Sequence, residues 1–222
     1  FKINPGESFA IVGPTGSGKT TITKLITKFY EVNTGNILID GKDINHYALE
    51  TLRSKIGVIL QDVFLFADTI YNNITLFNDN ITLENVENAA KELEIHDFIN
   101  SLPGGYSFNV SERGTTLSAG QKQLIAFLRV LVNNPDILIL DEATSSIDSY
   151  SEDLIKNATK KITKDKTSII IAHRLSTIES ADKIIYMENG KILETGNHKQ
   201  LLSIPNGKFK KLYEEQFIDE LV

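Results

Sequence analysis

The most informative segment of the sequence is Gly13-Pro14-Thr15-Gly16-Ser17-Gly18-Lys19-Thr20. It follows the run Phe9-Ala10-Ile11-Val12, whose continuous apolar character predicts a buried strand of a parallel sheet. After the stretch, apolar residues recur with the spacing of one helical face, namely Ile22, Leu25, Ile26 and Phe29. A strand, a glycine-rich loop and a helix in this order predict the first unit of an α/β domain.

The same stretch predicts a phosphate-binding loop, because it fits the pattern G-x-x-x-x-G-K-[ST]. Its glycines let backbone N–H groups turn towards phosphate oxygens, and the helix N-terminus adds a partial positive charge. We expect Lys19 to bridge the β- and γ-phosphates and the Thr20 hydroxyl to bind Mg²⁺. An ordinary glycine turn is the alternative, and the strand–loop–helix context favours the phosphate loop. The expected nucleotide-binding residues here are Gly13, Pro14, Thr15, Gly16, Ser17, Gly18, Lys19, Thr20 and Thr21.

Apolar runs further along the chain predict the other strands of a mostly parallel sheet. These runs are 37–39, 56–60, 137–140 and 168–172, followed by a hairpin of 184–187 and 192–193 around Asn189-Gly190. Residues from about 75 to 132 differ, because Thr82 predicts the start of one helix and Ser118 the start of another. We therefore expect a helical insert within an α/β core. Helices are also predicted from Ser149 and in the tail after about 197.

Two adjacent carboxylates, Asp141 and Glu142, follow the apolar run 137–140. An aspartate at the carboxyl end of a buried strand beside a phosphate loop can hold the shell of a Mg²⁺ ion. Glu142 could polarise an attacking water. Surface carboxylates at the exit of a strand are the simpler alternative, which the phosphate loop disfavours.

The segment Leu117-Ser118-Ala119-Gly120-Gln121 predicts a second anion site. Ser118 and Gln121 have the spacing of a capping box, and the helix that they open has an apolar face of Leu124, Ile125, Leu128 and Leu131. A hydroxyl and free N–H groups at a helix N-terminus can bind an anion. Taken alone, the segment favours a well-capped helix that binds nothing, because capping boxes are common.

The same segment resembles the LSGGQ signature of ABC ATPases, with Ala119 in place of the first glycine. Three further matches follow the family order: Gln61 resembles the Q-loop glutamine, 145–148 the D-loop and His173 the switch histidine. A lone histidine at a strand end is usually unremarkable, but the ordered set is specific and covers essentially the whole chain. The resemblance implies an α/β P-loop NTPase core of RecA type, with a helical subdomain and a partial antiparallel β subdomain.

The resemblance also implies roles for individual residues. ATP would contact Gln61, Ser118, Ala119, Gly120 and Gln121 in addition to the phosphate loop, and His173 would contact the γ-phosphate. Catalysis would fall to Glu142, His173 and Lys19. Mg²⁺ would be held by Thr20, Gln61 and Asp141, the last through water. The family layout implies a core of about 1–74 and 133–196, a helical subdomain of about 75–132 and C-terminal helices of about 197–222.

Ser111-Glu112-Arg113-Gly114 resembles the X-loop of exporter-type domains, although a polar turn is an alternative. Residues 61–74 and 172–177 resemble multidrug, lipid and peptide exporters. This likeness implies ATP hydrolysis that powers export of an unknown substrate at the cytoplasmic face of a membrane, such as the bacterial inner membrane. The implied partners are a second nucleotide-binding domain, identical or not, and transmembrane domains upstream on the same polypeptide. The opening at Phe1, in what reads as a strand end, favours a fragment of a longer protein.

Composition narrows the alternatives. The formal net charge is −6 and the 23 Lys and Arg are scattered, so nucleic acid is not an expected partner. The chain has no cysteine, which excludes disulfides and thiolate metal sites. A soluble ABC ATPase of DNA maintenance or translation is the main rival, and it is disfavoured because 62–116 is short and lacks heptads. A nucleotide-binding regulatory module without turnover is the other, disfavoured by the presence of Glu142 and His173.

One family feature has no counterpart in the sequence. The family stacks adenine on an aromatic residue roughly 20 residues before the phosphate loop. Phe1 and Phe9 lie too close to that loop, and Phe9 is predicted to be in the core. No residue is therefore given the adenine-stacking role.

Overall fold

The computed structural model describes residues 1–111, 114–141, 149–172 and 175–217. The chain divides into two compact units. The first, here called the sheet unit, comprises Phe1–Val58, Asp136–Glu142 and Asp165–Val222. The second, the helical unit, comprises Ile59–Pro135 and Ala143–Lys164.

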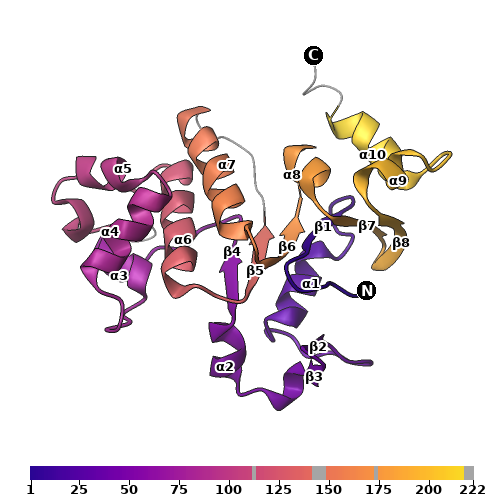
Figure 1. The fold of residues 1–222 in the computed structure, drawn as a ribbon, viewed down its shortest axis with the longest axis horizontal. Helices are drawn as coiled ribbons and strands as arrows, with labels where there is room; N and C mark the ends of the chain where they lie inside the picture. Colours follow the sequence, from indigo (N-terminus) through magenta and orange to yellow (C-terminus); the bar gives the residue numbers. More distant parts are fainter. Residues whose placement is uncertain (112–113, 142–148, 173–174, 218–222) are drawn as a thin grey trace. The chain divides into compact units, whose positions relative to one another are not determined.

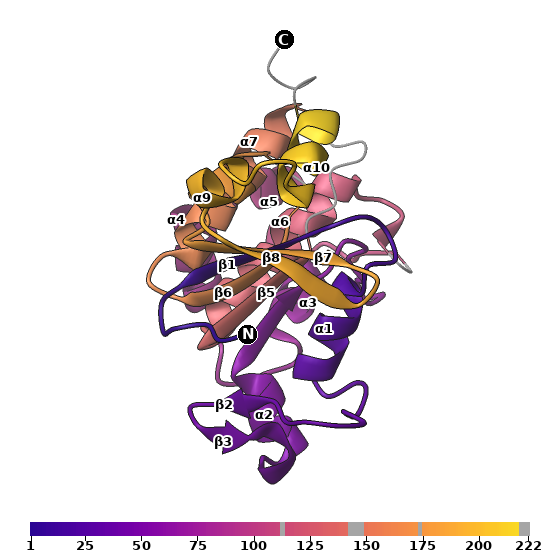
Figure 2. The same cartoon turned by 90° about the vertical axis from the view of Figure 1, so that its right-hand side faces the viewer.

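Among the described residues, the sheet unit contains a six-stranded sheet with the strand order β4-β5-β6-β1-β7-β8 (Figure 1). The strands are β1 Ser8–Val12, β4 Ile56–Ile59, β5 Ile137–Asp141, β6 Thr167–Ile171, β7 Lys183–Glu188 and β8 Lys191–Gly196. β1 is parallel to both β6 and β7, and β5 is parallel to β6. β7 and β8 form the predicted antiparallel hairpin, which faces the viewer in Figure 2. The other strand predictions are confirmed, although β4 ends one residue earlier than expected, before the exposed Leu60. The run 37–39 is the exception, because its strand pairs antiparallel with residues 42–43 in a separate two-stranded sheet.

The side chains of β1 alternate between two hydrophobic clusters, one on each face of the sheet. Ala10 and Val12 pack in a cluster completed by α8 Leu175–Ser180, α9 His198–Leu202 and α10 Lys208–Phe217. Phe9 and Ile11 pack on the other face, in a cluster completed by α1 Lys19–Ile26, η1 Ile44–His46 and α2 Leu49–Ser54. Successive side chains of a strand point to opposite faces, so a strand covered on both faces must be apolar throughout. This explains the unbroken run at 9–12 and confirms that Phe9 belongs to the core.

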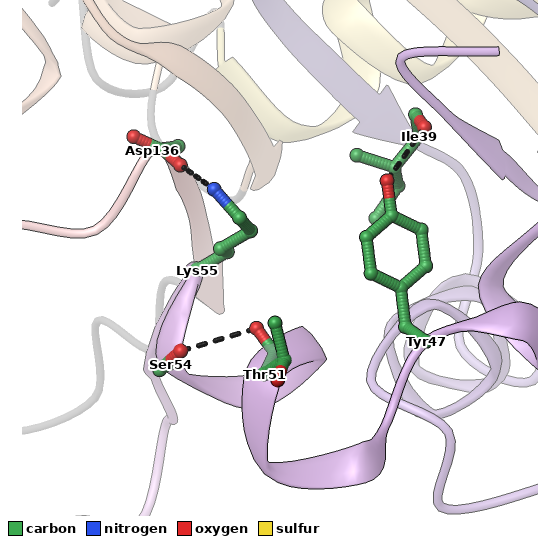
Figure 3. A network of polar contacts seen from close by, with 6 residues as sticks. All are labelled: Ile39, Tyr47, Thr51, Ser54, Lys55 and Asp136. Atoms are coloured by element: carbon green, nitrogen blue, oxygen red, sulfur yellow. Dashed lines mark hydrogen bonds and ion pairs between the residues drawn. The ribbon is translucent and has the colours of Figure 1, made fainter. Parts of the chain in front are cut away.

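A small polar network links α2 to the neighbouring strands of the sheet unit (Figure 3). Tyr47 donates its hydroxyl to the carbonyl of Ile39, at 3.1 Å, in the short hairpin of β2 Leu38–Ile39 and β3 Lys42–Asp43. Lys55 and Asp136 form an ion pair of 2.8 Å, and the backbone N–H of Asp136 donates to the carbonyl of Lys55. The side-chain hydrogen bond from the Lys55 ammonium to the Asp136 carboxylate, together with the charge of Asp136, raises the pKa of Lys55. The ion pair is exposed, so it fixes the starts of β4 and β5 more than it stabilises the domain.

The helical unit is built around the central helix α6 Ala119–Asn133, which packs against α3, α4 and α7. The other helices are α3 Ile70–Thr75, α4 Leu83–Glu92, α5 His96–Ser101, η2 Gly105–Ser107 and α7 Ser149–Thr163. Thr82 caps α4 through the predicted hydrogen bond, here as a capping box with Asn85. Within the described residues, no helix is long and apolar enough to cross a bilayer.

The predicted helical face after the glycine-rich loop is wrong at its last member, Phe29. Helix α1 ends at Ile26, and Lys28 adopts a left-handed conformation with φ of 56°. The backbone N–H of Phe29 then bonds back to the carbonyl of Lys24 and closes the helix end. Phe29 is consequently 66% exposed, with the Arg53 guanidinium 4.4 Å from its ring centroid. A helix stop in a non-glycine left-handed residue gives little sequence signal, which is why the periodicity misled.

Candidate nucleotide-binding site

The glycine-rich loop lies at the carboxyl edge of the parallel sheet. β1, β6 and β5 are adjacent and run in the same direction. Their register places Ile11 beside Ile171, and Ile171 beside Asp141. Asp141 and the loop that starts at Gly13 therefore leave the sheet at the same edge, where parallel α/β sheets bind their ligands.

Glycine is required at position 13 for steric reasons. Gly13 has φ of 149°, and a Cβ built there would lie 2.1 Å from the carbonyl oxygen of Met187. The loop also accepts a hydrogen bond of 3.1 Å from the turn of the β7–β8 hairpin, donated by the N–H of Gly190 to the carbonyl of Ser17. Hairpin and loop thus touch at two points, and these contacts fix the shape of the loop.

Lys19 is the buried cation of this loop. Its side chain is only 8% exposed, and its Nζ donates to the carbonyls of Gly13, at 2.7 Å, and Pro14, at 3.1 Å. Burial lowers the pKa of Lys19, and the negative charge of Asp141 partly opposes that shift. A cation held among carbonyls inside a glycine loop is placed to exchange those carbonyls for the oxygens of an anion.

Several donors at this loop fit a phosphate group. Gly18 precedes α1 in a left-handed conformation and supplies no side-chain cap, so the first turn of the helix depends on another acceptor. Ser17 is 2% exposed, and its Oγ has no hydrogen-bond partner among the described residues. Gly16, with φ of 80°, and Gly18, with φ of 103°, adopt backbone conformations that turn N–H groups towards one centre. These N–H groups and the Ser17 hydroxyl could together donate hydrogen bonds to the oxygens of a polyphosphate.

Among the described residues, no group of three or more His, Cys, Asp or Glu side chains is placed to hold a metal ion. Thr20 follows Lys19 in the first turn of α1, and Asp141 is close enough to perturb the pKa of Lys19. Mg²⁺ prefers oxygen ligands and commonly takes part of its shell from substrate phosphates and water. A hydroxyl and a carboxylate at one sheet edge fit that ion when it arrives with a nucleotide.

The second predicted anion site has the predicted local structure. The Oγ of Ser118 accepts a hydrogen bond from the N–H of Gln121, at 3.2 Å, and the Oε1 of Gln121 accepts one from the N–H of Ser118, at 3.0 Å. This capping box opens α6 with Ser118 exposed at the helix N-terminus. Gln61 is also exposed, in the loop after β4.

The predicted site residues are thus divided between the two units. The sheet unit holds residues 13–21 and Asp141, and the helical unit holds Gln61 and residues 118–121. Four predicted elements lie outside the described residues, namely Glu142, His173, 145–148 and 112–113. Sequence reasoning missed Met187 as a residue that shapes the loop. Its hairpin was readable from Asn189-Gly190, but no sequence signal reveals a contact between segments so far apart.

A parallel sheet with a glycine loop and a buried lysine at its carboxyl edge defines a P-loop nucleotide-binding domain. Residues 1–145 match the family model described as ABC transporter, and the chain belongs to that family. The predicted family and the predicted α/β fold with a helical insert are therefore confirmed.

Three similar proteins have descriptions that refer to export. The chain is 49% identical over 213 residues to the "Putative multidrug export ATP-binding/permease protein YgaD" of Bacillus subtilis (strain 168), covering 96% of this chain and 37% of that protein. A protein with the same description from Staphylococcus aureus (strain NCTC 8325 / PS 47) is 49% identical over 216 residues, covering 97% and 37%. A solved structure of a bacterial Atm1-family ABC exporter with ATP bound is 42% identical, with a TM-score of 0.87, covering 100% of this chain and 38% of that one. The chain spans little more than a third of the length of these relatives.

Proposed function

We propose that this chain binds ATP with Mg²⁺ and hydrolyses it to power the export of a substrate across a membrane. One observation carries the proposal: Lys19 is buried inside a loop in which Gly13 cannot bear a side chain, at the sheet edge where Asp141 also emerges. The likeness to an exporter that was solved with ATP bound supports ATP as the nucleotide.

Each residue of the site then has a task. Lys19 exchanges the carbonyls of Gly13 and Pro14 for phosphate oxygens, and the N–H groups of residues 16–21 surround the same phosphates. Thr20, Asp141 and Gln61 would hold Mg²⁺, which would neutralise charge on the transferring phosphoryl group. Glu142 orients or deprotonates the attacking water, and His173 stabilises the γ-phosphate. These last two roles follow from the family resemblance and the order of the motifs.

The complete site needs two copies of the domain. The phosphate loop and Ser118 are both anion-binding helix N-termini, yet they belong to different units of one chain. Two chains related by a two-fold axis can each supply Ser118 to the ATP on the phosphate loop of the other. We propose this arrangement, with a second nucleotide-binding domain that is identical or closely similar.

The other proposed partner is a transmembrane domain. Phe64, Phe66 and Phe77 are 56%, 43% and 57% exposed, and they contact one another edge to face, with ring centroids 5.2 and 6.3 Å apart. An exposed group of three phenylalanines is typical of a protein interface. The relatives named above combine an ATP-binding part with a permease part. We therefore place this aromatic surface against the permease part of the same polypeptide, at the cytoplasmic face of the membrane.

Phosphate release from Mg-ATP tests the proposal. The chain should hydrolyse ATP, Lys19→Ala should stop hydrolysis, and chelation of Mg²⁺ should do the same. Lys24→Ala is the matched control, because Lys24 lies on the same helix but over the ring of Tyr30, at 5.3 Å from its centroid. Unchanged turnover in Lys19→Ala would contradict the proposed site. Hydrolysis without any link to membrane transport in the full-length protein would favour the soluble ABC ATPase instead.

A further inference from the structure

Arg129, on α6 of the helical unit, is a half-buried cation without an acidic partner. Its Nε donates to the carbonyl of Asn73, at 2.9 Å, and its Nη2 donates to the carbonyl of Phe64, at 3.4 Å. In the part of the chain that the structure describes, no carboxylate lies within ion-pairing distance of it. Burial lowers the pKa of Arg129. Removing even part of a cation from water costs free energy, and two carbonyls offset that cost only in part. The position of Arg129 between these carbonyls therefore suggests a role other than stabilising the fold.

Asn73 connects Arg129 to the loop that carries the exposed aromatic side chains. The Asn73 side chain is fully buried, and its Oδ1 accepts a hydrogen bond from the N–H of Phe66, at 2.8 Å. Its Nδ2 donates to the carbonyls of Phe66 and Thr69, both at 3.0 Å. The side chain of Asn73 therefore holds the loop while its carbonyl holds Arg129.

This loop, residues 64–69, here called the aromatic loop, is also fixed on its other side. Leu65 is buried, and a Cβ on Gly114 would lie 3.1 Å from its Cδ1. The N–H of Ile70 donates to the carbonyl of Phe108, and the N–H of Val110 donates to the carbonyl of Asp68, each at 2.9 Å. Phe64 and Phe66 are exposed, but the backbone that carries them is fixed. A force on these rings must therefore reach the rest of the helical unit.

Helix α6 carries such a force to the nucleotide. Ser118 is its N-cap and Arg129 lies eleven residues further on, about 16 Å along the axis of the helix. Every residue from Gln123 to Leu128 is buried, so this part of the helix is held as one rigid element. A shift imposed at Arg129 moves Ser118 with it.

We propose that Arg129 is a positioning residue that transmits displacement of the aromatic loop to Ser118. This inference rests on the function proposed above, in which a permease part contacts the aromatic loop and Ser118 contacts ATP. Arginine suits the task because its planar guanidinium makes two directed, charge-assisted bonds to carbonyls of two separate segments. A lysine supplies the positive charge but not the planar set of N–H donors, and an apolar side chain supplies neither.

The test uses the full-length protein, with its membrane part, in lipid vesicles and measures ATP hydrolysis over a range of ATP concentrations. Arg129→Met should lower kcat by roughly 10-fold or more, as expected when a charged hydrogen-bond donor is removed. KM for ATP should change little, because the phosphate loop is untouched. Arg129→Lys should recover part of the loss. Arg53→Met is the matched control, because Arg53 also donates to two backbone carbonyls, those of Thr27 and Lys28, but does not contact the aromatic loop.

A double-mutant cycle with Phe66→Ala shows whether Arg129 acts by coupling the aromatic loop to Ser118 or only by stabilising the fold. If Arg129 and Phe66 act along one connection, the double variant should lose no more kcat than the worse single variant. Multiplicative losses, or an unchanged kcat in Arg129→Met, would overturn the inference while leaving the proposed function intact. An absence of Mg-ATP hydrolysis in the unmutated protein would instead overturn the proposed function itself. If Arg129→Met fails to fold, the cycle with Arg129→Lys gives the same decision.

Discussion

The carbonyl oxygen of Met187 occupies the space where a side chain on Gly13 would begin. An added Cβ would approach it to 2.1 Å, and no side-chain rotation can relieve this clash, because the carbonyl is part of the backbone and the position of a Cβ is fixed by the backbone. The phosphate loop and the β7–β8 hairpin are thus fitted to each other.

We expect Gly13→Ala to weaken ATP binding by at least roughly 100-fold, because the loop must move away from Met187 and lose the geometry of its N–H groups. Gly6→Ala is the control. Gly6 has φ of 74°, and nothing lies within 4 Å of an added Cβ. The Gly6→Ala variant therefore has an alanine in a strained left-handed conformation, but without a steric clash. Fluorescent-nucleotide titration measures both variants, and equal affinities would contradict the steric role of Met187.

We expect Glu142→Gln to keep ATP binding and to lose roughly 100-fold or more in turnover, because only the group that activates water is removed. Nucleotide titration and phosphate release measure the two quantities separately. Near-normal turnover would exclude Glu142 as the catalytic carboxylate.

We expect two inactive variants to restore activity when they are mixed. A Lys19→Ala chain keeps its Ser118, and a Ser118→Arg chain keeps its phosphate loop, so a mixed dimer has one intact site. Phosphate release should be close to zero for each variant alone and should return on mixing. In Glu142→Gln, ATP should also shift the chain from monomer to dimer in sedimentation, and Ser118→Arg should remove that shift. Rates strictly proportional to protein concentration, without rescue, would exclude the shared site.

We expect Tyr106 to titrate about two pH units later than an ordinary tyrosine. Burial, with the charge of Glu87 as a smaller cause, raises the pKa of Tyr106 to about 12, and its hydroxyl lies 2.8 Å from the Nδ1 of His96. The native state therefore keeps this proton longer than the unfolded state does. The stabilisation is complete below about pH 10 and is lost as the pH rises through about 12. Ultraviolet titration of tyrosinate should show one late group that Tyr106→Phe removes.

The sequence predicted the local elements of the site well, because each depends on neighbours in the chain. The phosphate loop sits between its strand and its helix, and Ser118 and Gln121 form the expected capping box. Contacts between distant segments were not predictable from one sequence. The approach of Met187 to Gly13 and the bonds from Arg129 to Asn73 each join residues that share no local pattern. The prediction for Phe29 failed for a related reason, because periodicity identifies a helical face but not the residue at which the helix stops.

The hydrogen bonds from Lys19 to the carbonyls of Gly13 and Pro14 make nucleotide binding an exchange reaction. A ligand can bind the ammonium group of Lys19 only if it replaces the hydrogen bonds that this group makes to the two carbonyls. A single orthophosphate could contact fewer of the loop's other donors than a triphosphate could. It would therefore offset the loss of the two carbonyl hydrogen bonds less well. A ligand with fewer phosphate groups makes fewer contacts with which to compete against these two carbonyls, so we expect the loop to hold the products of hydrolysis less tightly than ATP.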